Sequence, residues 1–289
     1  MSAIWGRLNR QRFPGGWDAL QAVGRAADVD VSLWFGPIGG YQYRPKRIEF
    51  ARSAGFEIYG DKLCLGGPRY KEHVIESFSH WAAQGMDYIK VDGFWPNCPV
   101  AEHGHPVGLA AGVAQMNALM EVFAAWRQAR PNLLIGYTSG SNPSPFWLQH
   151  ADFVWRGGRD DSHTGKGTPF DQHNTYLDSV LQEHRGTDLP ISGFVTFDIV
   201  QDRIRGGDDR VYERGFWWLA ARTSLHHDWY LESADLTLEQ WKMLARAARW
   251  AKEHEKMFRF GRMLGGNPAR GEVYGFSAFD AVRLVVTLH

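Results

Sequence analysis

The sequence predicts an α/β fold, a (β/α)8 TIM-type barrel that is incomplete at the N-terminus and runs into the start of a C-terminal antiparallel β domain. Short apolar strands alternate with amphipathic helices, which is typical of a parallel α/β architecture. Charged and polar residues gather where the predicted strands end, and parallel barrels build their active sites at those ends. After Phe260 the chain becomes rich in Gly punctuation and β-branched residues, which favours antiparallel strands.

The predicted elements follow one another in a regular order. The strands are expected at 29–37, 87–92, 132–140, 151–156 and 190–198, with a short strand or strand-like turn at 225–231. The helices are expected at 69–85, at 175–185, at 212–224, at 237–258 with Thr237 as its cap, and in a long segment ending before Pro131. We expect that long helix to turn Val113, Met116, Leu119, Met120, Phe123 and Ala124 inward. This gives about six strand–helix units, two fewer than a closed barrel contains.

The domain organisation follows from these elements. We assign residues 1–260 to a barrel that lacks its first strands and residues 261–289 to the beginning of the β domain. A doubly wound parallel sheet is the rival architecture. No Gly-x-Gly-x-x-Gly follows a strand and no phosphate-binding Gly-Lys-Ser/Thr loop is present, so nothing indicates a nucleotide-binding fold.

Composition excludes several classes of partner. The 289 residues include 32 basic and 32 acidic side chains, so no charge excess indicates a nucleic acid or a membrane surface. We count no apolar run of about 18 residues, the length that spans a bilayer. Cys64 and Cys98 are the only cysteines, and we expect free thiols in a reducing, cytoplasmic compartment. The 13 tryptophans suit a core, and they also suit the apolar faces of sugars.

The segment DYIKVD places a lysine two positions before an aspartate at a strand end. Residues two apart in a strand share a face, so Lys90 and Asp92 point the same way. Burying two charges is costly unless they have a partner or a chemical task. Asp92 fits a nucleophile that a neighbouring ammonium keeps ionised. The alternative is an aspartate that only caps the following turn.

A second carboxylate follows the strand at 151–156. Two carboxylates facing each other suit the cleavage of a glycosidic bond, one as nucleophile and one as acid. Asp160 fits the acid because it lies in the Gly-rich loop WRGGRDDS, where its exposure can vary. A solvated acidic loop is the alternative for Asp160, and Arg156 could simply pair with Asp160 or Asp161.

Other polar residues at strand ends complete the candidate set. Asp198 ends the strand at 190–198, and we include it among the substrate-binding residues. The histidines at 103–105 and 226–228 lack the helical His-x-x-x-His spacing of many metal sites, so we expect surface or core roles for them. We therefore expect no metal and no organic cofactor.

Several motifs resemble one known family. DYIKVDGF is similar to the Lys-aromatic-Asp strand of the melibiase-type α-galactosidases, which belong with α-N-acetylgalactosaminidases in glycoside hydrolase clan D. ADFVWRGGRDD resembles their Trp-Arg-x-x-x-Asp strand, RFPGGWDAL their Phe-Pro-x-Gly helix start, and VSLWFGP their third barrel strand. These motifs stand in the family's order and extend over essentially the whole chain.

The resemblance implies a function and roles for particular residues. It implies a retaining α-glycosidase, without a cofactor, that hydrolyses terminal α-galactosides in oligosaccharides or other glycosides by double displacement. Asp92 would be the nucleophile and Asp160 the acid/base. Lys90, Arg156 and Trp34 would contact the bound sugar. The C-terminal strands would open a β-sandwich.

The sequence also departs from the family pattern. Val91 replaces the usual aromatic residue, and YTSGSNPSPFW stands where the family carries a motif that helps to select the sugar's substituents. The two strands expected before RFPGG, with their acidic sugar-binding pair, are absent, and AVRLVVTLH reads as a final strand without a hydrogen-bonding partner. We therefore expect the chain alone to be poorly soluble or a homo-oligomer, with weak or no activity. A non-catalytic carbohydrate-binding relative and a metal-dependent hydrolase are the other hypotheses.

Overall fold

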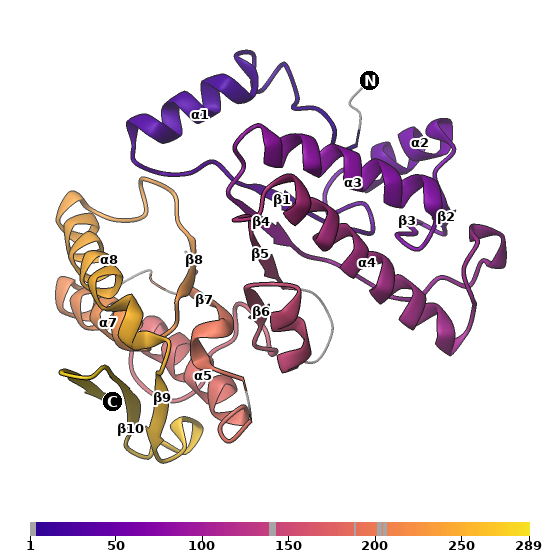
Figure 1. The fold of residues 1–289 in the computed structure, drawn as a ribbon. Coiled ribbons are helices and arrows are strands. Elements are labelled where there is room, and N and C mark those ends of the chain that lie inside the picture. The colour runs from indigo at the N-terminus through magenta and orange to yellow at the C-terminus, as the bar shows by residue number, and fades with distance from the viewer. Residues whose placement is uncertain (1–3, 139–142, 188, 201–203, 205–206) are drawn as a thin grey trace. The chain divides into compact units, whose positions relative to one another are not determined.

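A computed structural model describes residues 4–138, 143–187, 189–200, 204 and 207–289 (Figure 1). The chain divides into two compact units. Unit 1 contains Met1–Ser141 and Gln149–Asp152, and unit 2 contains Asn142–Leu148 and Phe153–His289. Each unit holds three neighbouring strands of the parallel sheet, together with the helices that connect them. This arrangement fits an incomplete (β/α) barrel.

The parallel sheet of unit 1 consists of β1 (Leu33–Phe35), β4 (Tyr88–Val91) and β5 (Leu134–Tyr137), in that order. The register pairs Trp34 with Lys90 and Val91 with Tyr137. The ladder continues past β4, because the amide of Asp92 donates to the carbonyl of Phe35 at 2.8 Å. The carboxyl ends of these strands therefore share one edge, and Asp92 lies on it.

Two long helices, α3 (Pro68–Ala83) and α4 (Leu109–Ala129), lie side by side in unit 1 (Figure 1). An aromatic cluster joins them to the sheet. The ring of Phe35 lies 4.9 Å from Phe78 and 5.7 Å from Trp126. Phe78 and Trp126 are themselves 5.0 Å apart, and all three side chains are buried. Each such ring pair contributes about 0.5–1.5 kcal/mol beyond its buried area.

The inward face of α4 differs from the prediction. Leu119 and Phe123 are buried as expected, but Val113 is 62% exposed and Ala124 is also exposed. The side chains that are buried are Ala111, Gln115, Ala118, Leu119, Val122, Phe123 and Trp126. The prediction assigned the face from the most apolar residues, whereas the helix turns small residues and Gln115 toward its neighbours.

The same helix has a composition that suits a membrane as well as a core. Among the described residues, α4 is the one helix long and apolar enough to cross a bilayer by length and composition, although we had counted no such run. Here Glu121 of α4 pairs with Lys71 of α3, and Arg127 pairs with Asp152 at 2.8 Å. A helix packed in a protein core meets the same test, so the composition alone is weak evidence for a membrane.

Unit 1 also contains small elements that the periodicity did not predict. They are α1 (Gly16–Ala26), α2 (Arg44–Ala54), the hairpin of β2 (Ile58–Tyr59) and β3 (Lys62–Leu63), and the one-turn helix η1 (Ala101–His103). Helix α1 is fixed through Trp17, whose indole donates to the carbonyl of Gln84 at 2.9 Å.

The parallel sheet of unit 2 consists of β6 (Phe153–Trp155), β7 (Phe194–Val200) and β8 (His226–Tyr230). The segment at 225–231 is thus a true strand. The pairing of β7 with β8 shifts register between Phe197 and Ile199, so Asp198 lies at a bulge. Bulges redirect side chains near functional sites.

Within the described residues of unit 2, the helices α5 (Pro169–Glu183), α7 (Asp209–Ala221) and α8 (Leu238–Phe258) pack together. Their core includes Phe170, Phe216 and Leu244. Helix α5 begins six residues before the predicted start at 175. The reason is a capping box, in which Thr168 and Asp171 each accept from the other's backbone amide.

Three antiparallel strands follow Phe260 as predicted. They are β9 (Arg262–Gly265), β10 (Tyr274–Phe279) and β11 (Leu284–Leu288), in the order β11-β10-β9. The last strand does have a partner, contrary to the expectation, because it pairs with β10 and His289 donates to the carbonyl of Tyr274 at 2.8 Å. The sheet belongs to the same compact unit as β6–β8. The domain boundary at 260 and the β-sandwich stay predictions.

Candidate active site

Asp92 follows β4 directly and lies beside two aromatic side chains that donate hydrogen bonds to it. Its two carboxylate oxygens accept from the indole of Trp34 and from the hydroxyl of Tyr41, each at 3.4 Å. Trp34 comes from β1, and its ring lies 5.8 Å from that of Tyr41. Lys90, one strand repeat before Asp92, is half-buried and pairs in register with Trp34. The structure thus brings Trp34, Lys90 and Asp92 to one strand end.

Tyr41 is a member of this cluster that the sequence reasoning missed. A glycine gives it access: Gly93 has φ +73°, and a Cβ there would lie 2.8 Å from the Tyr41 hydroxyl. The GPIGG turn before Tyr41 also requires special backbone, with Gly39 at φ +104° and Gly40 at φ +73°. The glycines beside this strand end were the one feature of the sequence that could have indicated a close contact with Asp92.

Each unit contains a cavity. The cavity in unit 1 measures ≈ 910 Å³, and the one in unit 2 measures ≈ 770 Å³. Trp34 and Tyr41, the two donors to Asp92, line the cavity in unit 1, whereas Asp92 and Lys90 are not among its lining residues. Arg12, Lys46 and Arg47 line it as well, so cationic and aromatic groups face the same space. Such a mixture suits a polar ligand that also has an apolar face, as a sugar does.

Asp160 and Arg156 follow the carboxyl end of β6 in unit 2. Asp160 is exposed, whereas Arg156 is fully buried. Burial lowers the pKa of the Arg156 guanidinium, and the charge of Asp160 acts in the opposite direction. The amide of Arg159 donates to the hydroxyl of Tyr176 at 2.6 Å, which fixes the loop on α5. Asp92 and Asp160 therefore each follow a strand's carboxyl end, as predicted, and the distance between them stays a prediction.

Asp198 belongs to a buried ionic network. Its two oxygens bond to Arg222 Nη1 at 2.7 Å and to His227 Nδ1. Arg222 Nε also donates to Asp178 Oδ1 at 2.7 Å, and all three of these charged side chains have no exposed surface. Burial alone would lower the pKa of Arg222, but the two carboxylates outweigh that effect and raise it. A direct contact between Asp198 and a sugar stays a prediction, and His227 is its partner nearer to solvent.

The two histidine motifs have different surroundings. His226 pairs with Asp228 at 3.0 Å, and His227 pairs with Asp198. The motif at 103–105 instead gathers with both cysteines. The potential ligand atoms of Cys64, Cys98, His103 and His105 all lie within 4.8 Å of one another. Among the described residues this is the one group of its kind, and the sequence reasoning missed it because Cys64 comes from a different turn than the other three.

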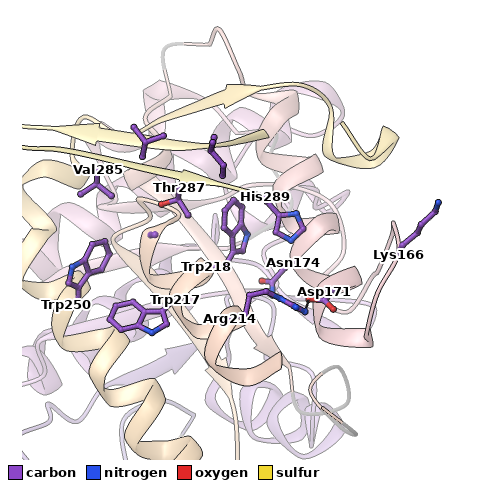
Figure 2. Close-up of a pocket in the computed structure, with 14 residues that line it drawn as sticks. Lys166, Asp171, Asn174, Arg214, Trp217, Trp218, Trp250, Val285, Thr287 and His289 are labelled. Carbon is purple, nitrogen blue, oxygen red and sulfur yellow. Dashed lines mark hydrogen bonds and ion pairs between the residues drawn. The ribbon is translucent and has the colours of Figure 1, made fainter. Parts of the chain in front are cut away.

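The second cavity, ≈ 770 Å³, lies among α5, α7, α8 and β11 of unit 2 (Figure 2). Trp217, Trp218 and Trp250 form its aromatic part. At its polar end Arg214 pairs with Asp171, the capping residue of α5. None of the predicted site residues lines this cavity, so it is a weaker candidate for the chemistry.

Comparison with known proteins rests on structure alone, because no family model and no curated protein sequence matches the chain. A GH36 α-galactosidase, AgaA from Geobacillus stearothermophilus, solved in complex with raffinose, matches with a TM-score of 0.68 and 15% identity. The match covers 98% of this chain and 39% of that one. The α-galactosidase AgaB from the same organism gives 0.67 and 16%, with coverage of 97% and 39%.

An α-amylase provides a second kind of match. The enzyme from Geobacillus thermoleovorans, complexed with acarbose, has a TM-score of 0.62 and 13% identity, and the match covers 94% of this chain and 68% of that one. The chain thus spans about two fifths of the length of the α-galactosidases that it matches. At these identities the likeness concerns the fold, and over nearly its whole length the chain has the fold found in part of the GH36 α-galactosidases.

Proposed function

We propose that this chain carries the active site of a retaining α-glycosidase that acts on terminal α-galactosides. One observation carries the proposal: Asp92 lies at the carboxyl end of β4, and both of its oxygens face aromatic donors at 3.4 Å. Because a fold alone does not imply a function, the assignment depends on the side chains at this strand end. The solved α-galactosidases with this fold support the reaction class.

Asp92 is the proposed nucleophile. A nucleophilic carboxylate has to keep one oxygen aimed at the sugar's anomeric carbon, and long hydrogen bonds from Trp34 and Tyr41 orient it without saturating it. Lys90, a half-buried residue, supplies positive charge on the same face of the strand. Trp34 also offers an indole face on which a sugar ring could stack.

Asp160 is the proposed acid/base. An acid must protonate the leaving oxygen and later activate water, so it needs contact with solvent and substrate. Asp160 is exposed, and it lies on a loop fixed to α5 by Tyr176. The buried guanidinium of Arg156 beneath this loop interacts electrostatically with Asp160 and gives the site a fixed positive charge.

The substrate class is proposed from the neighbours. One of the matched α-galactosidases, AgaA, was solved with raffinose and also with stachyose. We infer that oligosaccharides of this kind are substrates here as well. Part of the YTSGSNPSPFW segment, residues 139–142, lies outside the described residues, so its influence on the choice of sugar stays a prediction.

The test compares hydrolysis of nitrophenyl α-galactoside, α-glucoside and β-galactoside by the chain and by paired variants. Asp92→Asn should abolish turnover, whereas Asp87→Asn should not. Asp87 precedes β4 at the opposite end of the strand and pairs with Arg130, so it is the matched control. Even where the unchanged chain is only weakly active, measurable and equal turnover by Asp92→Asn and Asp87→Asn would contradict the assignment of the nucleophile.

Asp160→Asn should lose activity on raffinose but retain it on nitrophenyl α-galactoside, because a good leaving group needs little protonation. Asp161→Asn, the exposed neighbour, should behave like the unchanged chain. Retention predicts carboxyl groups about 5–5.5 Å apart and an α-configured first product. A β-configured first product in NMR would contradict the double displacement. Tight sugar binding without any turnover would favour the non-catalytic relative instead.

A further inference from the structure

We propose that Cys64, Cys98, His103 and His105 bind a structural zinc ion in unit 1. All four are described residues, and their potential ligand atoms lie within 4.8 Å of one another. Two thiolates and two imidazoles form a donor set that selects zinc among common divalent cations. The proposal is independent of the glycosidase assignment, because none of the four belongs to the proposed catalytic set.

The distances are close to those of a tetrahedral site. The sulfur of Cys64 lies 3.1 Å from His105 Nε2, and the sulfur of Cys98 lies 3.2 Å from His103 Nδ1. With zinc–sulfur bonds of about 2.3 Å and zinc–nitrogen bonds of about 2.0–2.1 Å, ligand atoms in a tetrahedron lie about 3.3–3.8 Å apart. The two close pairs would therefore need to separate by about 0.5 Å, and the widest pair, which spans up to 4.8 Å, would need to close by about 1 Å to hold the ion.

The outer hydrogen bonds already orient the ligands. His105 Nδ1 lies 2.8 Å from the carbonyl of Pro106, which favours a proton on Nδ1 and leaves Nε2 with its lone pair toward the cluster. Gln115 of α4 is buried, accepts from the amide of Gly66 at 2.9 Å, and donates to the Cys64 sulfur at 2.9 Å. An amide donor to sulfur stabilises a thiolate.

The backbone is also shaped for four ligands. Gly104 stands between the two histidines at φ +79°, a left-handed turn that lets both rings face the same point. Gly66 passes so close that an added Cβ would lie 2.6 Å from the Gln115 amide nitrogen and 3.0 Å from the His105 ring. A larger residue at Gly66 would displace a ligand and its hydrogen-bond partner together.

Zinc binding would also change the protonation of the cluster. A bound dication deprotonates a coordinating thiol outright, so loading the site with zinc should release protons.

The ion would have a structural effect rather than a catalytic one. Four protein ligands fill a tetrahedron and leave no position for water or substrate. Cys98, His103 and His105 lie on the loop that begins at Asp92, and Cys64 follows the β2–β3 hairpin. Zinc would therefore attach the loop after the proposed nucleophile to that hairpin.

The experiment measures metal in the full chain after removal of any affinity tag. Protein purified under reducing conditions and supplied with zinc should hold about one ion per chain by mass spectrometry. The cobalt-substituted protein should show the visible bands of a tetrahedral ion and thiolate-to-cobalt charge transfer. Cys98→Ser and His103→Asn should lose both signals, and His80→Asn, an exposed histidine of α3, should keep them.

A second variant tests the outer hydrogen bonds. Gln115→Ala retains all four ligands and should lower zinc affinity by about 10–100-fold in chelator competition. Stoichiometry well below one ion in the unchanged chain would overturn the proposal. So would a Cys64–Cys98 disulfide in protein isolated from a reducing cytoplasm, or cobalt spectra without charge transfer. Unchanged zinc content in Cys98→Ser would also overturn it.

Discussion

The buried ionic network of unit 2 predicts an order of stability among its variants. Arg222 lies between two carboxylates, with Asp178 and Asp198 each 2.7 Å from a guanidinium nitrogen. Its third nitrogen, Nη2, donates to Asn174 Oδ1 at 3.0 Å. Arg222→Met would leave two carboxylates with no exposed surface and no cation between them. Asp178→Asn would leave Arg222 paired with Asp198. The first change should therefore cost far more than the second.

The magnitudes follow from these contacts. Removing one partner of a buried ion pair costs about 3–5 kcal/mol, and we expect Arg222→Met near 5 kcal/mol because it strands two charges. Asp178→Asn removes the charge of one hydrogen-bonding partner and should lower the free energy of unfolding by about 1.5–3 kcal/mol. A natural domain has only about 5–15 kcal/mol of stability, so Arg222→Met should be close to unfolded. Glu239→Gln, at an exposed pair with Lys242, should cost at most about 1 kcal/mol.

The assay is urea unfolding at pH 7, followed by circular dichroism, with the free energy of unfolding compared among the three variants. If Arg222→Met is too unstable to purify, Arg222→Lys takes its place, because lysine retains the charge with fewer donors. The free energy of unfolding of Arg222→Lys should lie between those expected for Arg222→Met and Asp178→Asn. Stability of Arg222→Met or Arg222→Lys equal to that of Asp178→Asn would refute the reasoning, because the network would then not depend on its shared cation.

Further predictions concern single contacts. Gly93→Ala should lower the free energy of unfolding by about 1–2 kcal/mol, because the left-handed φ of +73° at this position disfavours a side chain. It should also lower glycosidase activity, because the new Cβ would displace Tyr41. Thermal melting and steady-state kinetics measure the two effects. Thr168→Ala removes the capping box of α5 and should cost about 1 kcal/mol in urea unfolding. Tyr274 donates to Asp178 at 2.8 Å, and burial, reinforced by that carboxylate, raises its pKa above the ordinary value near 10. Its contribution is complete below about pH 10 and is lost as the pH rises further, so Tyr274→Phe should flatten the alkaline decline of the unfolding free energy; an unchanged decline would contradict it.

Periodicity predicted the strands and helices that repeat, and local chemistry decided the rest. The core strands at 87–92 and 132–140 contain short apolar runs that are typical of buried strands, so the sequence predicted their positions. The hairpin at 58–63 and helix α2 have no such signal, because their few buried side chains depend on neighbours distant in sequence. The start of α5 was missed because its capping box precedes the apolar pattern.

The candidate sites show the same division. Asp92 was readable because a charge after a buried strand is expensive unless it has a task. The contact between Asp92 and Tyr41 could not be predicted, because 51 positions separate the two residues. A turn with three glycines, which begins at Gly36, brings Tyr41 close to Asp92. The Cys/His cluster was missed for a related reason. Metal ligands carry a recognisable spacing only when one helix or one loop supplies them, and Cys64 comes from a different turn than the other three.

The shared fold makes the strand ends decisive for function. GH36 α-galactosidases and an α-amylase match this chain with TM-scores of 0.68 and 0.62, so the backbone hardly separates the two enzyme classes. What differs among such enzymes is the set of side chains that follow the strands. In this chain β4 ends in Lys90 and Asp92 beneath Trp34 and Tyr41, and these groups meet within one compact unit. Under the proposed function, the choice of sugar would depend on a few side chains at one sheet edge, and exchanging those residues is a sharper probe of function than a comparison of folds.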